Sequence, residues 1–76
     1  MPVSSQTETI REHLMVNNEE YQRLYREHAL YEAQLEVLGN KHYLNDQEQV
    51  EEVRLKKLKL RTKDQMENLV HRAYSV

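Results

Sequence analysis

The sequence contains no cysteine, and it has one glycine, Gly39, and one proline, Pro2, among 76 residues. Without cysteine, neither a disulfide nor a thiolate metal site can stabilise the fold. Phe and Trp are also absent, so the core must consist of Leu and Val, with the five Tyr at its margins. A chain this short buries little apolar surface, and we therefore expect it to share a core with a second copy or with another protein.

Long apolar segments are missing as well. No run approaches the roughly 20 apolar residues of a membrane span, and the first residues, MPVSSQTETIRE, lack the apolar core of a signal peptide. No segment pairs a strong apolar face with a uniformly basic one, which disfavours binding to a membrane surface. We expect a cytoplasmic protein without membrane contact.

Residues 3–38 and 40–76 contain neither Gly nor Pro and are rich in Glu, Gln, Lys, Arg and Leu, a composition typical of helices. Ser5 and Glu8 have the spacing of a capping box, which predicts a short helix ending near Val16. Asn17 and Asn18 interrupt it, and this pair is suited to ending one helix and capping the next, which begins near Glu19. Residues 1–18 are thus expected to form an N-terminal arm.

Residues 19–74 are expected to form one domain with helices at about 19–38 and 46–73. Gly39 is placed where a left-handed residue ends many helices, and Asn45 with Glu48 repeats the capping-box pattern. A short loop between two long helices makes them antiparallel neighbours. The predicted fold is all-α, a helical hairpin preceded by a short helix, which dimerises into a four-helix bundle.

The first long helix carries a regular apolar seam. Its members are spaced 3, 4, 3, 4 and 3 residues apart, as in a coiled coil. They are Tyr21, Leu24, His28, Tyr31, Leu35 and Leu38.

The second long helix presents two apolar faces at about 100° per residue. Val50, Val53 and Leu60 share one face. The other holds Leu55, Leu58, Thr62, Met66, Leu69 and Ala73. One face can pack on the hairpin partner, and the other then needs a surface from elsewhere, most simply a second copy. We expect Asp at Leu58 or Met66 to shift the protein toward monomer and to lower its helicity.

The basic run RLKKLKLRTKD, residues 54–64, lies on this helix. Its cations divide between two flanks. Arg54, Lys57 and Arg61 lie on one, and Lys56, Lys59 and Lys63 lie on the other. Flanking cations cover apolar surface with their stems and border a seam, as e and g residues do. The alternative is that these six residues contact RNA or DNA, which the overall negative charge opposes.

Charge is also divided along the chain. Residues 1–53 hold 4 basic and 11 acidic side chains, whereas residues 54–76 hold 7 basic and 2 acidic. An antiparallel hairpin or dimer brings the acidic part beside the basic part. Such complementarity sets register and orientation more than it adds stability.

Two motifs, one in each long helix, resemble those of the YdcH-like family of small bacterial proteins of unknown function. The first comprises Tyr21, Leu24, Glu27 and His28, and the second comprises Leu55, Lys56, Lys57, Lys59, Leu60, Lys63 and Asp64. The resemblance covers about residues 19–72. It implies a helical hairpin that dimerises into a four-helix arrangement, and it implies no activity. Leu58 and Thr62 depart from the family pattern, which indicates an outer apolar face shifted by one turn.

His28 occupies a seam position, where protonation would loosen a dimer contact; the alternative is a structural histidine bonded to a carboxylate such as Glu32. No Glu is followed by His three residues later, so the pattern of a di-metal bundle is missing. The remaining candidate metal ligands are the Glu67–His71 pair and His42 in the loop. We nevertheless expect no metal or other cofactor. With no Cys, and with Ser only near the ends, we expect no enzyme.

The sequence thus predicts a small, non-enzymatic helical interaction module that forms a homodimer and has an unidentified protein partner. The alternative function is that of an RNA- or DNA-binding accessory protein.

Overall fold

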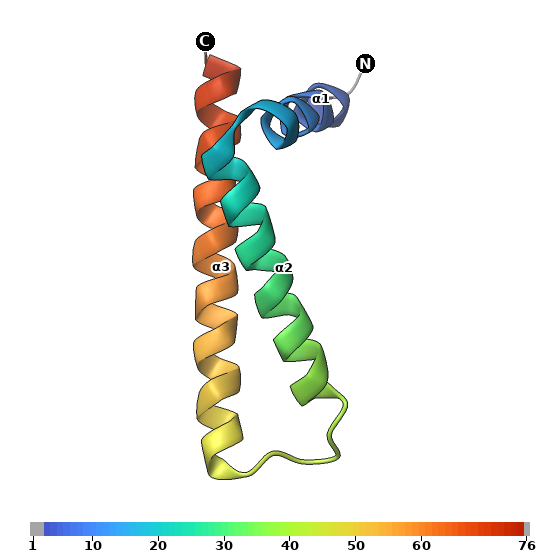
Figure 1. Cartoon of the computed structure of the whole chain (residues 1–76), viewed down its shortest axis with the longest axis vertical. Coiled ribbons are helices and arrows are strands. Elements are labelled where there is room, and N and C mark those ends of the chain that lie inside the picture. Colours follow the sequence, from blue (N-terminus) through green and yellow to red (C-terminus); the bar gives the residue numbers. More distant parts are fainter. Residues whose placement is uncertain (1–2, 76) are drawn as a thin grey trace.

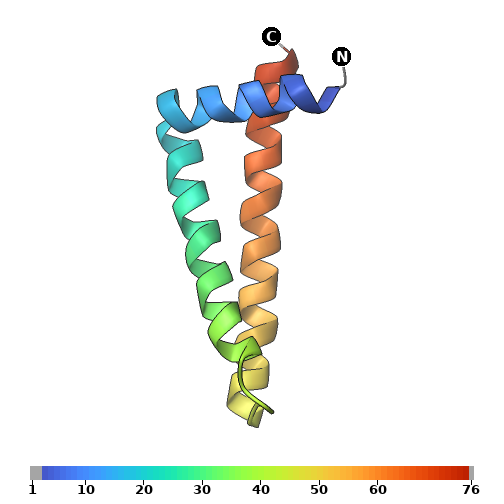
Figure 2. The same ribbon diagram turned by 90° about the vertical axis from the view of Figure 1, so that its right-hand side faces the viewer.

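The computed structural model describes residues 3–75, and the side chains of residues 8–74. It contains three helices, α1 (Val3–Asn17), α2 (Glu19–Gly39) and α3 (Asp46–Ser75), and no strand within these residues. Helices α2 and α3 lie side by side and antiparallel, and α1 crosses the end of this hairpin (Figure 1 and Figure 2). No helix of the described part is long and apolar enough to cross a membrane.

Asn18 separates α1 from α2 and caps α2. Its backbone is extended, with φ −115° and ψ 112°, and its Oδ1 accepts a hydrogen bond from the Tyr21 N–H at 2.8 Å. This confirms that the Asn17–Asn18 pair caps the next helix, and it assigns the cap to Asn18. The role predicted for Ser5 is wrong, because α1 already begins at Val3 and Ser5 lies inside it; its side chain is outside the described part.

The end of α2 also differs from the prediction. Gly39 belongs to the helix, and no described residue has a positive φ. Asn40 ends the helix in a right-handed conformation, and its N–H donates to the Glu36 carbonyl at 3.1 Å. Two of the last carbonyls of α2, those of Glu36 and Leu38, thus accept hydrogen bonds without a left-handed residue.

Asn45 and Glu48 form the predicted capping box at the start of α3. The Glu48 N–H donates to Asn45 Oδ1 at 2.7 Å, and the Asn45 N–H donates to Glu48 Oε1 at 3.1 Å. Lys41 adds an ion pair to Glu48. Hydrogen bonds from Lys41 and from the Asn45 backbone lower the pKa of Glu48, so this contribution to stability is complete above the ordinary pKa and is lost as the pH falls through the lowered one.

Replacing Asn45 by Ala should lower the free energy of unfolding by about 1 kcal/mol, because the Glu48 N–H at the start of α3 loses its side-chain acceptor. Urea unfolding followed by circular dichroism measures the change. Gln47→Ala is the control, because Gln47 is exposed in the same turn and takes no part in the capping box. Equal stability of the two variants would contradict a stabilising cap.

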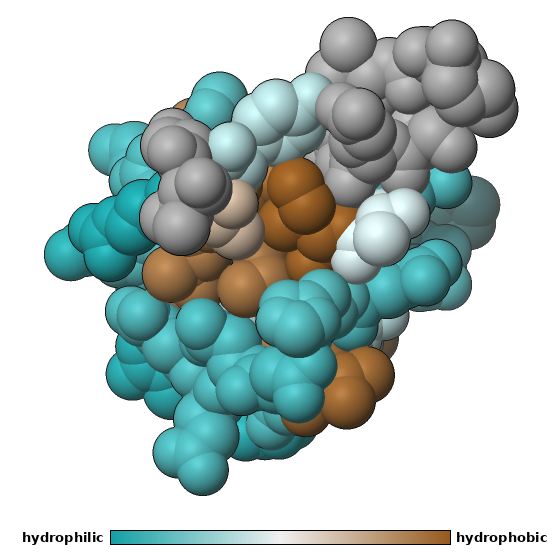
Figure 3. Space-filling view, turned by 90° about the horizontal axis from the view of Figure 1, so that it is seen from above, coloured by the Kyte–Doolittle hydropathy of each residue, from teal (hydrophilic) through white to brown (hydrophobic). Residues whose placement is uncertain are grey.

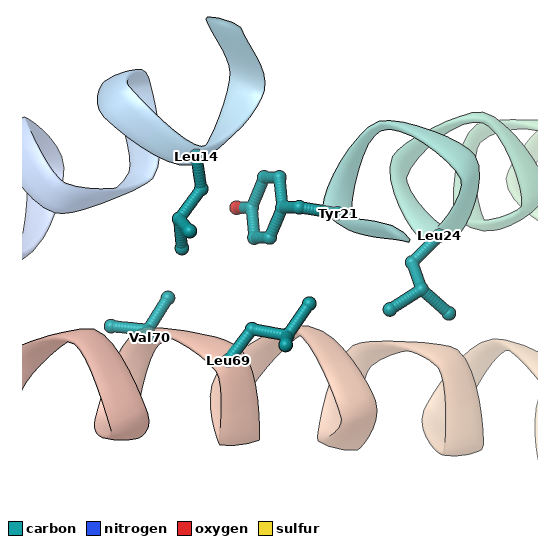
Figure 4. Close-up of a cluster of buried hydrophobic side chains, with 5 residues drawn as sticks. All are labelled: Leu14, Tyr21, Leu24, Leu69 and Val70. Carbon is teal, nitrogen blue, oxygen red and sulfur yellow. The ribbon is translucent and has the colours of Figure 1, made fainter. Parts of the chain in front are cut away.

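The main core lies where the three helices meet (Figure 4). Leu14 comes from α1, Tyr21 and Leu24 from α2, and Leu69 and Val70 from α3. In Figure 4 the Tyr21 ring lies beside Leu14, and Leu69 and Val70 approach from the opposite helix. Seen from above, apolar side chains gather in the middle of this end of the molecule, with polar side chains around them (Figure 3). Helix α1 therefore completes a core that the hairpin alone would leave open.

Further along the hairpin, Leu55 and Thr62 of α3 are buried and Leu58 is half-buried, while Met66, also half-buried, packs against the main core. The face of α3 that contains them is the inner face, packed on α2. From the sequence we expected Leu58 and Thr62 to mark an outer apolar face shifted by one turn. That expectation is wrong, because both residues lie on the inner face. Asp at Leu58 or Met66 would disrupt the hairpin itself, so it cannot serve as a specific test of dimerisation.

Candidate functional site: the uncovered surface of helix α3

Besides Tyr74 near its end, α3 exposes three large apolar side chains on one side. Val50, Val53 and Leu60 have exposed fractions of 69%, 52% and 60%, and we call them the outer strip. They lie on the side of α3 opposite to Leu55 and Thr62, since positions 53 and 60 are about 180° from 55 and 62 on a helix. Figure 1 shows α1 and α2 on one side of α3, with its other side uncovered along the helix. The outer strip therefore has no partner within the described chain.

Two shallow grooves adjoin the outer strip, one after the other along α3. The first, of about 460 Å³, is lined by Asp46, Gln49, Val50 and Val53; we call these four residues the acidic patch. The second has a volume of about 440 Å³. Its lining, the lysine patch, comprises Leu35, Glu52, Lys56, Lys59, Leu60 and Lys63. Each patch thus combines apolar and charged side chains.

A larger groove, of about 750 Å³, lies at the corner where α1 crosses the hairpin. Its lining includes Met15, Tyr25, His28, Met66 and Val70. Two ion pairs stand at its margin: Arg11 Nη2 lies 2.8 Å from Glu67 Oε1, and Lys59 Nζ lies 3.3 Å from Glu32 Oε1. This corner groove is largely apolar and open.

Tyr21 lines the corner groove with its ring, and burial raises the pKa of its hydroxyl above the ordinary 10.0. Arg11 opposes this rise in pKa, and Glu67 adds to it. The hydroxyl therefore stays protonated at neutral pH. It cannot act as a base there.

The cations of the basic run fall into two groups. Arg54, Lys56 and Lys59 pair with carboxylates: Arg54 Nη2 lies 3.0 Å from Glu51 Oε1, and Lys56 Nζ lies 3.8 Å from Glu52 Oε1. The hydrogen bonds of the Arg54–Glu51 pair lower the pKa of Glu51 and raise that of Arg54. Within the described part, Lys57, Arg61 and Lys63 lie beyond 4.0 Å of any carboxylate. Half of the cations are thus already neutralised locally.

The residues predicted for the hairpin and dimer core lie in different environments. The six seam residues of α2 are buried or half-buried, and so are Leu55, Leu58, Met66 and Leu69 of α3. Val53 and Leu60 lie apart from them on the outer strip. The structure thus divides the predicted set into an inner group and an uncovered pair.

His28 is half-buried at the corner groove, and Glu32 pairs with Lys59 instead of with His28. Glu67 pairs with Arg11 rather than sharing an ion with His71. Among the described residues, no group of three His, Asp or Glu side chains is arranged to hold a metal ion.

Sequence reasoning missed two features of the junction between α1 and the hairpin. Leu14 and Val70 belong to the core, and Gln22 Nε2 donates to the Met15 and Val16 carbonyls at 2.8 and 3.2 Å, which ties the end of α1 to α2. The only sequence signal was Ile10 and Leu14, spaced one turn apart on the short helix.

The model of the family described as Protein of unknown function (DUF465) matches residues 22–70. The match covers most of α2, the loop and most of α3, and it leaves out α1. No curated protein matches the chain, and no solved structure does.

Proposed function

Because the chain belongs to the DUF465 family of unknown function, we propose from the geometry that it is a non-enzymatic, self-associating helical module. The observation that carries the proposal is the outer strip. Three large apolar side chains on one side of a 30-residue helix are exposed, although the opposite side of the same helix is packed. Covering such a strip with a second copy removes apolar surface from water at both protomers.

The corner groove extends this proposal to a further partner. It is open, largely apolar and bordered by ion pairs, features that suit the docking of an amphipathic segment of another protein. We propose that self-association and partner binding use separate surfaces, the outer strip and the corner groove.

Leu60→Asp should weaken self-association at least about 100-fold, because a symmetric dimer loses the burial of two leucines and must bury two carboxylates. Sedimentation equilibrium over a range of protein concentrations measures the effect. Leu60 is 60% exposed in the single chain, so the hairpin itself should remain helical by circular dichroism.

The matched control is Leu30→Asp, which changes a leucine of α2 that is 55% exposed. Leu30 is opposite to the seam of α2 and lies outside the outer strip, so its variant should associate like the unchanged protein. A monomeric unchanged protein, or equal weakening by both variants, would contradict the proposal.

The nucleic-acid alternative stays a prediction. Its six cations lie on two flanks of α3, and three of them are paired with Glu side chains. This arrangement offers a phosphate backbone less free positive charge than the sequence suggests.

A further inference from the structure

Helix α1 is held on the hairpin by few side chains. Among the α1 side chains that the structure describes, Leu14 alone is buried, and Ile10 and Met15 are half-buried against the same core. Arg11 pairs with Glu67 at 2.8 Å, but both side chains stay open to water, with exposed fractions of 45% and 39%. The contact of α1 with the hairpin is therefore small and concentrated in less than two turns of the helix.

The hairpin supplies most of the apolar surface at this end. Leu24 and Leu69 are buried there, with the Tyr21 ring and Val70 nearer to α1 (Figure 4). Tyr21, Val70 and the half-buried Met66 also line the corner groove, so the same surface continues past α1. The apolar end of the hairpin is thus larger than the part that α1 covers.

The family match separates these two parts of the molecule. It covers residues 22–70, which include Leu24, Leu69 and Val70, and it leaves out α1. The hairpin with its apolar end is therefore the unit that the family model describes, and α1 is an addition placed against it. Asn18 alone joins α1 to α2, so a change of conformation at this residue moves α1 off the hairpin while α2 and α3 stay packed.

Building on the proposed docking of another protein at the corner groove, we propose that the end of the hairpin is a helix-binding site. Helix α1 occupies this site within its own chain, and an amphipathic helix of a partner protein takes its place. The seated α1 shows which chemistry fits, because Ile10 and Leu14, one turn apart, meet the core while Arg11 reaches Glu67. The partner helix is thus one with an apolar, a basic and a second apolar residue at this spacing.

The corner groove gives such a helix an advantage over α1. Met15 and Val16 of α1 line the groove without filling it, and Val16 is 75% exposed. Larger apolar side chains at these two positions of a partner helix reach further into the groove and bury more apolar surface. A partner helix can therefore keep the contacts of α1 and add new ones.

The seated α1 regulates the affinity of the site. A ligand that needs the open form binds with an apparent affinity reduced by the fraction of molecules that are open. Opening costs mainly the burial of Leu14 and of two half-buried side chains, which is less than the cost of unfolding the hairpin. Helix α1 thus excludes weak ligands and yields to a helix that matches the site better.

Hydrogen exchange in the unchanged protein tests whether α1 opens by itself. After correction for intrinsic rates, we expect the amides of residues 10–16 to exchange at least about 10-fold faster than those of residues 24–34 and 60–70, since α1 leaves while α2 and α3 stay packed. Equal protection of the three helices would mean that α1 leaves only on global unfolding, and it would overturn the proposal.

A synthetic peptide of residues 3–17, which is α1 itself, is the probe for the site. It should bind full-length Leu14→Asp, in which the chain's own α1 is detached, at least about 10-fold more tightly than the unchanged protein, where α1 competes. Fluorescence anisotropy of the labelled peptide measures both affinities. As matched controls, the His13→Asp peptide, changed at an exposed position, should bind like the unchanged peptide, and the Leu14→Asp peptide should not bind.

Charge reversal tests whether the peptide lies where α1 lies. Arg11→Glu in the peptide should weaken its binding to the Leu14→Asp protein about 5-fold, and adding Glu67→Arg to that protein should recover most of the loss, because the pair is re-formed with its signs exchanged. Binding that is indifferent to both changes would place the peptide elsewhere and overturn the proposed site.

The outcomes separate this inference from the function proposed above. If Leu14→Asp keeps a helical hairpin by circular dichroism but does not bind the peptide, the helix-binding site is overturned. Equal binding to the two proteins would show docking beside a seated α1, which overturns displacement and leaves the corner groove as a partner surface. A monomeric protein overturns self-association alone and does not affect the site at the end of the hairpin.

Discussion

Leu24→Ala should lower the free energy of unfolding by about 3 to 4 kcal/mol, one of the two largest effects that we expect from a single substitution in this chain. Leu24 is 1% exposed and belongs to the cluster at which the three helices meet. Truncation removes the apolar transfer energy of the side chain and leaves a cavity between α2 and α3, where a packed interface cannot close fully. For a domain of this size the loss is a large part of the total stability.

Thermal unfolding followed at 222 nm measures the effect, with an expected fall of roughly 12 to 25 °C in Tm. Both proteins must be compared at one concentration, because self-association would make Tm concentration-dependent. Leu30→Ala is the matched control, since Leu30 lies on the same helix and is 55% exposed. An equal loss of stability in the two variants would show that Leu24 is not buried between α2 and α3.

Much of the hairpin could be predicted because the residues that begin its helices form hydrogen bonds with neighbours close in sequence. Asn18, Asn45 and Glu48 cap helices through hydrogen bonds that span three residues, so their sequence spacing nearly determines their geometry. Gly39 shows the limit of the same reasoning. Its position suits a left-handed cap, yet the backbone ends α2 one residue later in a right-handed turn.

The two faces of α3 could be recognised from the sequence, but their roles could not be assigned. Each face carries large apolar residues, and a wheel contains no information about which one meets α2. The structure places Leu55 inside at 2% exposure and Leu60 outside at 60%. Thr62 is also inside, and it is accommodated because its hydroxyl donates to the Leu58 carbonyl at 2.8 Å, within the same helix.

The contribution of α1 was the hardest part to predict, because it depends on contacts between distant residues. Arg11 and Glu67 are 56 residues apart in sequence and form a hydrogen-bonded ion pair. Leu14 meets Val70 across a similar separation. A short helix whose apolar residues include Ile10 and Leu14, one turn apart, gives no sequence indication of where it docks.

Leu14→Asp should detach α1 from the hairpin and lower the free energy of unfolding by roughly 2 to 4 kcal/mol. A carboxylate cannot remain among Tyr21, Leu69 and Val70 without a partner, so the helix leaves rather than burying it. The contact of α2 with α3 is more extensive than the contact of either with α1. The hairpin should therefore persist, and the loss of helix measured by circular dichroism should not exceed the 15 residues of α1.

The ionisation of Tyr21 gives this prediction an independent readout. In the intact protein burial raises the pKa of Tyr21, so its contribution to stability is complete below pH 10.0 and is lost as the pH rises through the higher folded-state pKa. Detaching α1 exposes the ring and should return the pKa toward 10.0. Absorbance at 295 nm follows the change, and Tyr21→Phe in each background identifies the Tyr21 component. The control is Val16→Asp, which changes an exposed residue of α1 and should leave the pKa of Tyr21 raised. An unchanged Tyr21 titration in Leu14→Asp would show that α1 does not cover the ring.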